Sequence, residues 1–226
     1  MAAATQPPTP AQGVIPELAF AVERVESLEY AAVPTLQFAL RIDAARDQSI
    51  RSILLDVQIQ IAARRRSYDE AAKEQLVDLF GAPERWGQTL RTLPWVRQTV
   101  IVPPFTGTTT VSVPITCTYD LDVAAASYLH ALGDGSVPLE FLFSGTVFFP
   151  ANGGALQAVR IPWTHEAEFA LPVSAWRAAI DRHFPDAAWL RLGRASFDRL
   201  RAYRGREALG SWEETIDALL AGREER

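Results

Sequence analysis

The stretch "ILLDVQIQI" (residues 53–61) decides the fold class of this chain. Ile53, Leu55, Val57, Ile59 and Ile61 recur at every second position, and the residues between them from Asp56 onward are polar. A period of two puts the aliphatic side chains on one face of a strand and the polar side chains on the other. Strands of this kind are typical of antiparallel sheets with one face on a core and one in water.

The same alternation recurs on both sides of this stretch. Residues 35–42 alternate after Pro34, and residues 108–119 carry an apolar stripe that includes Cys117. Less regular segments predict further strands at residues 18–28, 99–102, 139–149, 155–163 and 167–171. Turn residues punctuate them at 133–135 and 152–154, and residues 44–49 are expected to form a hairpin connection. Seven or eight strands without regular strand–helix alternation predict a mainly β fold, an antiparallel β-sandwich.

Two predicted helices interrupt the strands. Residues 67–70, Ser-Tyr-Asp-Glu, match a capping box, and the helix that follows is expected to end at Gly81 because Pro83 prevents its continuation. We therefore place a helical insertion at residues 67–92. A shorter helix is expected at residues 122–132, where Asp120 or Asp122 would cap it rather than join Asp134 in a calcium site.

The period changes to that of a helix from Pro172 onward. Trp176, Ile180 and Phe184 lie at helical spacing, and residues 211–214, Ser-Trp-Glu-Glu, form a second capping box. The sequence thus predicts an α+β chain in three parts: a flexible tail at 1–16, the sandwich at 17–171, and C-terminal helices at 172–226. We expect these helices to pack on the sandwich, since short isolated helices are marginal.

The composition excludes several classes of protein. The net charge is −5, which argues against nucleic acid, although seven arginines at residues 182–206 suit an acidic partner surface. The longest apolar runs are too short for a membrane-spanning helix, so no membrane insertion is expected. Residues 1–16 lack the basic start and apolar centre of a secretory signal, and the single cysteine excludes an internal disulfide. We expect a cytoplasmic protein.

The residues that usually carry chemistry show no catalytic pattern. His130, His165 and His183 have no metal-ligand spacing and no paired cysteines beside them. Ser144-Gly145 lies inside an apolar strand, where the glycine more naturally marks a bulge or a close backbone approach than a nucleophile. No glycine-rich phosphate loop occurs in the sequence. We therefore expect no enzyme, no cofactor and no metal.

The best candidates for a site are aromatic. The chain has six tryptophans, and two of them lie in or beside the polar insertion. Most tryptophans pack in cores, but tryptophan and arginine are also enriched at protein interfaces. The candidate partner-binding residues are Leu79, Phe80, Trp86, Trp95, Arg64 and Arg65.

Several segments together resemble a known family. They are Arg65-Arg66-x-Tyr68, "LVDLFGAPERWGQTLRTLPW", "VPPFTG", "VPITCTYDLDVAAASYLHAL", "PLEFLFSGTVFF" and "IPW". The sequence resembles a bacterial family of unknown function whose members lie in gene clusters of actinobacterial-type nickel–iron uptake hydrogenases. The resemblance extends from Leu18 to about Leu220 and implies an accessory or assembly role. It assigns no catalytic residue, and without a cysteine pair it does not imply direct nickel or iron–sulfur handling.

Three functions follow as hypotheses. The first is a non-enzymatic protein-binding module whose partner is a hydrogenase subunit or maturation factor. The second is a small-molecule binder or enzyme with a polar cleft between sandwich and C-terminal helices, using Asp120, His130, His165 and Glu166. The third is a self-assembling structural protein, because sandwich edges and exposed tryptophans can form homo-oligomers.

Overall fold

The computed structural model describes residues 16–45, 48–117, 123–151, 154–185 and 192–224. The chain divides into two compact units, residues 1–186 and residues 187–226. Within the described residues, the first unit contains the strands and the helices up to residue 183, and the second contains two helices. None of the helices in the described residues is both long and apolar enough to cross a membrane.

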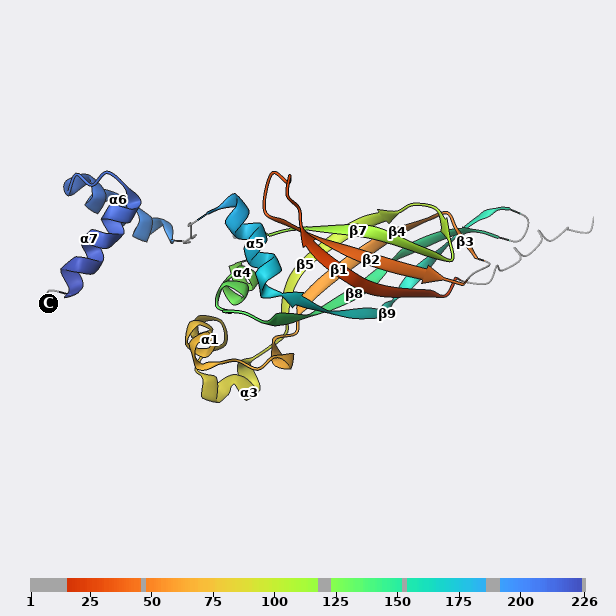
Figure 1. The fold of residues 1–226 in the computed structure, drawn as a ribbon, viewed down its shortest axis with the longest axis horizontal. Coiled ribbons are helices and arrows are strands. Elements are labelled where there is room, and N and C mark those ends of the chain that lie inside the picture. Colours follow the sequence, from red (N-terminus) through yellow and green to blue (C-terminus); the bar gives the residue numbers. More distant parts are fainter. Residues whose placement is uncertain (1–15, 46–47, 118–122, 152–153, 186–191, 225–226) are drawn as a thin grey trace, which may run out of the picture. The chain divides into compact units, whose positions relative to one another are not determined.

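The first unit is built on two antiparallel sheets (Figure 1). The smaller sheet has the order β1 (Leu18–Ser27), β2 (Thr35–Ala44), β7 (Thr108–Thr116). The larger has the order β5 (Leu93–Val102), β4 (Ser52–Ile61), β8 (Ser136–Pro150), β9 (Leu156–Pro172). A two-stranded ribbon of β3 (Ser49–Ile50) and β6 (Phe105–Thr106) completes the strands of the described residues. The predicted mainly β, antiparallel sandwich is confirmed.

The core lies between the two sheets. The five aliphatic residues of β4 that alternate in the sequence are all fully buried: Ile53, Leu55, Val57, Ile59 and Ile61. Phe38 of β2 faces them from the smaller sheet, with ring centroids 5.3 Å from Phe141 and 5.7 Å from Phe169. Each fully buried side chain of this size contributes roughly 1.5–3 kcal/mol to folding. The alternation therefore specifies which face of each strand meets the other sheet.

Two predictions about the connections are wrong. Residues 44–49 do not close a hairpin, because β2 pairs with β1 and β7 while β4 belongs to the other sheet. A strand alternates in the same way whichever sheet holds it, so periodicity could not distinguish the two. The segments expected as separate strands at 155–163 and 167–171 form one long strand, β9, which pairs with β8 along its length apart from a bulge.

The helical insertion follows β4 as a series of short turns. They are η1 (Ala63–Arg65), α1 (Glu70–Gln75), α2 (Val77–Phe80), η2 (Pro83–Arg85) and α3 (Trp86–Thr89). The predicted Ser67 cap is wrong: Asp69 caps α1, and its carboxylate accepts from the Ala72 N–H at 2.7 Å. The predicted stop is confirmed, since Gly81 ends α2 with a φ of 74°.

Two further helices complete the first unit, α4 (Val123–His130) and α5 (Val173–His183). α5 contacts β1, β2 and β9 and buries Trp176 and Ile180, so this part of residues 172–226 lies on the sandwich. α6 (Arg194–Arg206) and α7 (Trp212–Glu224) form the second unit. The second capping box is confirmed, because the Glu214 N–H donates to Ser211 Oγ at 3.0 Å and the Glu214 carboxylate accepts from the Ser211 N–H at 3.3 Å. The caps of α4 named above, Asp120 and Asp122, lie outside the described residues.

Gly145 of β8 occupies a position in the larger sheet that has no room for a side chain. Its φ is 144°, and an added Cβ would lie 2.1 Å from the backbone oxygen of Leu54 on the adjacent central strand. We predict that Gly145→Ala lowers the free energy of unfolding by about 3 kcal/mol or more, because backbone rather than a flexible side chain must move. Urea unfolding measures the loss.

Gly107→Ala is the matched control. Gly107 also has a positive φ, 72°, but an added Cβ meets nothing within 4 Å. This variant should lose only the roughly 1–2 kcal/mol of the left-handed backbone. Equal losses for the two variants would show that the close approach at Gly145 does not constrain the sheet.

Candidate functional site

Two of the predicted partner-binding residues are in the core. Phe80 is 4% exposed and Trp86 is 9% exposed. The Trp86 indole Nε1–H donates to the Gly81 carbonyl at 2.8 Å, and its ring meets the rings of Tyr68 and Phe80 edge to face. Trp86 therefore points inward and pins the insertion, and neither ring has a surface to offer a partner.

The other four predicted residues have different surroundings. Leu79 packs on the core beside the insertion, and Trp95 of β5 is half-buried, with its ring centroid 6.5 Å from that of Phe38 in edge-to-face geometry. Arg64 donates to the Leu90 carbonyl at the end of α3. Arg65 is half-exposed and pairs with Glu140 at 2.9 Å and with Glu168 on the outer face of the larger sheet. The six residues do not form one surface, and partner binding through these four stays a prediction.

The polar residues suggested for a cleft also have separate surroundings. His130 of α4 lies against the Trp176 ring, and His165 of β9 lies against the Phe20 ring. Asp120 is outside the described residues. Within the part of the chain that the structure describes, no group of three or more His, Cys, Asp or Glu side chains could hold a metal ion. Cys117 is buried, as the apolar stripe predicts.

A tyrosine pair, fully buried at Tyr128 and half-buried at Tyr68, joins the insertion to α4. The Tyr68 hydroxyl donates to the Ala63 carbonyl at 2.7 Å and lies 2.7 Å from the Tyr128 hydroxyl. Because the carbonyl can only accept, Tyr128 is the donor to Tyr68. Burial, and after it the hydrogen bond to Tyr68, raises the pKa of Tyr128 far above its usual value. Tyr128 therefore stays neutral and serves as the hydrogen-bond donor that ties α4 to the insertion.

Three exposed apolar residues of the first unit lie instead on the outer face of the larger sheet. Trp163 of β9 is 81% exposed, Ile101 of β5 is 73% exposed, and Leu54 of β4 is 46% exposed. Leu54 and Ile101 are register partners on neighbouring strands. An open hollow of about 230 Å³ beside them is lined by Asp56, Gln58, Arg97, Leu142, Phe143, Ser144 and Trp163.

A bulge in β9 turns Trp163 outward. Phe143 of β8 pairs with His165 and Gly145 pairs with Ile161, so Ser144 alone faces the three residues 162–164. The two additional residues cannot join the ladder, and bulges of this kind redirect side chains. All three residues of the bulge are exposed, whereas Ile161 just before them is 5% exposed.

A fixed polar group lies beside these apolar side chains. Asp56 of β4 accepts from the Thr99 hydroxyl at 2.6 Å and from Arg97 Nη2 at 3.1 Å. The hydrogen bond from Thr99, and with it the interaction with Arg97, lowers the pKa of the Asp56 carboxyl. Asp56 therefore stays ionised at neutral pH and holds Arg97 across the two strands. The face combines apolar anchors with one oriented ion pair.

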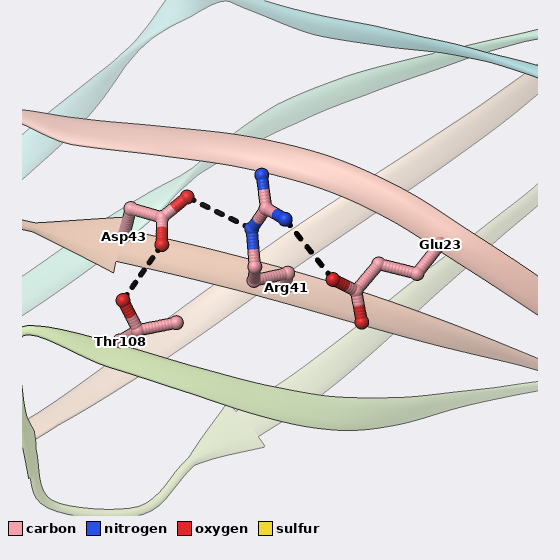
Figure 2. A network of polar contacts seen from close by, with 4 residues as sticks. All are labelled: Glu23, Arg41, Asp43 and Thr108. Carbon is pink, nitrogen blue, oxygen red and sulfur yellow. Dashed lines mark hydrogen bonds and ion pairs between the residues drawn. The ribbon is translucent and has the colours of Figure 1, made fainter.

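The outer face of the smaller sheet is different in kind. There Arg41 pairs with Glu23 at 3.1 Å and with Asp43 at 3.0 Å, and the Thr108 hydroxyl donates to Asp43 at 2.8 Å (Figure 2). These groups satisfy one another across three strands. Partly exposed pairs of this sort contribute little to stability, but they keep this face polar and solvated. The contrast singles out the face that carries Trp163.

Sequence reasoning missed Trp163 because it treated the tryptophan as a member of a regular strand. The available signal was local: Ile161-Pro162-Trp163 places two large apolar residues around a proline within a strand pattern. Proline inside a sheet is confined to edges and bulges. β9 is an edge strand and residue 162 lies in its bulge, so both conditions hold.

Comparisons with known proteins identify a family and nothing beyond it. The model of a family of unknown function, DUF6084, matches residues 15–226. No curated protein matches the sequence. The solution structure of a candidate late embryogenesis abundant (LEA) protein aligns at 15% identity and a TM-score of 0.31, over 70% of this chain and 73% of that chain.

A crystal structure of β-glucosidase from Kluyveromyces marxianus aligns at 9% identity and a TM-score of 0.24. The glucose complex of that enzyme aligns at 8% identity with the same TM-score. Each alignment covers 70% of this chain but only 15% of the enzyme. Alignments at these scores carry no argument about activity.

The tyrosine pair predicts how stability depends on alkaline pH. Tyr128 has a usual pKa of 10.0 when unfolded and a raised pKa when folded, so the unfolded chain ionises first as pH rises. The contribution of Tyr128 to the free energy of unfolding is therefore complete below pH 10.0 and is lost progressively above it. We predict that Tyr128→Phe costs about 1 kcal/mol at neutral pH. The variant should also flatten the fall in unfolding free energy above pH 10.0.

Urea unfolding from neutral to alkaline pH measures both effects. Tyr30→Phe is the control, because Tyr30 is 94% exposed and should follow the wild-type curve. A Tyr128→Phe curve parallel to that of the wild type above pH 10 would contradict the account of the pair.

Proposed function

The chain belongs to DUF6084, a family of unknown function, and from this premise we propose that it is a non-enzymatic protein-binding module. Its partner docks on the outer face of the larger sheet. The observation that carries this proposal is the 81% exposure of Trp163 on a bulge that directs it into solvent. Tryptophan side chains of this kind are the commonest anchors of protein interfaces.

The composition of the face supports a protein partner. Trp163, Leu54 and Ile101 supply apolar area, and a partner that covered them would remove it from water. Arg65, with Glu140 and Glu168, supplies a charged rim farther along β8 and β9. Protein interfaces combine apolar area with polar groups and hydrogen bonds. The Asp56–Arg97 pair adds an oriented group that can fix the partner's register.

The size of the hollow favours a protein over a small molecule. Its volume is about 230 Å³ and it is open to solvent. Pockets that bind small molecules usually enclose roughly 300–1,000 Å³. A flat face with a shallow hollow suits a protruding side chain of a partner better than an enclosed ligand.

The resemblance to hydrogenase-associated proteins supplies the class of partner. We propose a nickel–iron hydrogenase subunit or a maturation factor, with this chain as an accessory or assembly factor. In this role the chain contributes binding and positioning rather than chemistry. The partner presents an apolar side chain to Trp163 and a charged or polar group to the Asp56–Arg97 pair.

We predict that Trp163→Ala removes the partner while the fold is kept. Affinity purification of the tagged chain from its native cell, followed by mass spectrometry, should recover a hydrogenase component with the wild type and not with the variant. With that component purified, the dissociation constant should rise about 30-fold or more, as expected for a hot-spot tryptophan. Thermal unfolding should stay close to that of the wild type, because Trp163 is exposed.

Tyr30→Ala is the matched control, since it removes an exposed aromatic residue of the same unit outside this face. It should keep the partner. Equal recovery with Trp163→Ala and the wild type would overturn the docking face. If the proteins recovered in a Trp163-dependent way are unrelated to hydrogenases, the proposed docking face stands and the proposed class of partner is overturned.

A further inference from the structure

The helical pair α6–α7 leaves its apolar residues uncovered. Among the residues described in the second unit, only Thr215 is buried. The exposed apolar side chains there are Leu192, Phe197, Ile216, Leu219 and Leu220. Each helix has 13 residues, a length at which isolated helices are marginal in water. The pair needs a cover for its apolar residues.

One face of α6 combines apolar and cationic residues. Successive spacings of one, three and three residues place four side chains along one side of the helix: Arg199, Leu200, Tyr203 and Arg206. They line an open hollow of about 400 Å³ together with Ser196, Ala202 and Leu219. The ion pair of α6 within the described residues is Arg194 with Asp198, so Arg199 and Arg206 face no carboxylate there. We call Ser196, Arg199, Leu200, Tyr203 and Arg206 the basic stripe.

One face of α7 is its counterpart. Four exposed residues share this face at positions i, i+3, i+4 and i+7: Glu213, Ile216, Asp217 and Leu220. We call these four residues the acidic stripe. It carries two apolar side chains and two carboxylates, as the basic stripe carries two apolar side chains and two guanidinium groups. The stripes match in period and carry opposite charge.

The two stripes do not meet within one copy. The residue of α7 that lines the hollow is Leu219, and the acidic stripe is centred roughly 110° around the helix from it. α6 and α7 are joined instead through the Trp212 ring, which packs against Phe197 and lies 4.8 Å below the Arg204 guanidinium. A single hairpin therefore presents both halves of a contact that it cannot close by itself.

We propose that a second copy of this chain closes the contact, so that α6–α7 is a homodimerisation element. The acidic stripe of each copy docks on the basic stripe of the other about a twofold axis. Such an isologous contact occurs twice, and the four helices together cover Ile216, Leu219 and Leu220, which each pair leaves exposed. Glu213 and Asp217 of one copy face Arg199 and Arg206 of the other. This contact is separate from the face that carries Trp163.

The charges favour this occupant over other surfaces. An anionic membrane or a nucleic acid would suit the basic stripe, but Glu213 and Asp217 stand between the apolar residues of α7 and would be repelled. A second copy uses both stripes at once. Docking of α6–α7 on its own sandwich would give a monomer, which the experiment distinguishes.

Light scattering on the purified full-length chain, separated by size, tests the proposal. The wild type should have a mass about twice 24.9 kDa at high micromolar concentration. Arg199→Glu/Arg206→Glu and Glu213→Arg/Asp217→Arg should each be monomers, because like charges then face each other. We expect at least a roughly 100-fold weaker dimer in each case. An equimolar mixture of the two variants should restore the dimer, because the exchanged charges are again complementary.

Arg194→Glu/Arg201→Glu is the control with the same change in charge. Both arginines lie on the side of α6 opposite the basic stripe, so this variant should remain a dimer. Circular dichroism of every variant should show wild-type helix content. Trp163→Ala should also remain a dimer, so failure of the docking face and failure of the dimer are separable.

Four results would overturn the proposal. One is a wild-type monomer near 24.9 kDa. Another is a dimer that survives both charge reversals, or variants that fail to associate when mixed. The last is a monomeric wild type that co-sediments with phosphatidylserine vesicles, which would assign the basic stripe to a membrane surface instead.

Discussion

The packing of the Phe38 ring between the two sheets is the contact on which the rest of the structure depends. Phe38 is fully buried on the central strand of the smaller sheet. Its ring touches Trp95 of β5, Phe141 of β8 and Phe169 of β9, so one side chain spans the larger sheet almost from edge to edge. Aromatic pairs in edge-to-face geometry add to the area that they bury. Once the apolar side chains of each strand point into the core, the alternation of side chains directs the remaining residues of that strand toward solvent.

The exposure of Trp163 is a consequence of that constraint and of one interruption to it. β8 keeps strict alternation against β4, so Phe143 is buried and Ser144 is turned outward. β9 leaves register with β8 at this point, next to Gly145, whose backbone approaches the Leu54 carbonyl of β4 too closely for a side chain. The two additional residues of β9 are taken up opposite Ser144. The close backbone approach that excludes a Cβ at residue 145 therefore lies beside Trp163, the most exposed apolar side chain on the outer face of the larger sheet.

The sequence predicts the features that depend on neighbours along the chain. The alternation of residues 53–61 predicts which side of β4 is buried, Gly81 predicts the end of α2, and Ser211 with Glu214 predicts the start of α7. The bulge expected at Gly145 is also present. Each of these signals acts within a few residues, through side-chain periodicity, backbone conformation or a local hydrogen bond.

Features that depend on distant partners are not predictable in this way. Ser67 and Asp69 are both good helix caps, and only the path of the chain decides that Asp69 accepts the Ala72 N–H. Trp86 lies inward because the Gly81 carbonyl and the Tyr68 ring meet it there, whereas Trp163 lies outward because β8 leaves it unpaired. Both are tryptophans after polar or proline-containing segments. Their opposite fates follow from tertiary contacts that periodicity does not contain.

The two proposed contacts would reinforce each other physically. A dimer formed through α6–α7 carries two copies of the face with Trp163, so a partner complex with two equivalent subunits could be held at both. The second binding event is then intramolecular, and its strength depends on an effective concentration rather than on new contacts. A shallow face with a single tryptophan anchor suits bivalent binding. Each contact can stay weak and reversible while the two contacts together hold the partner. The proposed role as an assembly factor requires that property, since such a factor releases its client when assembly is complete.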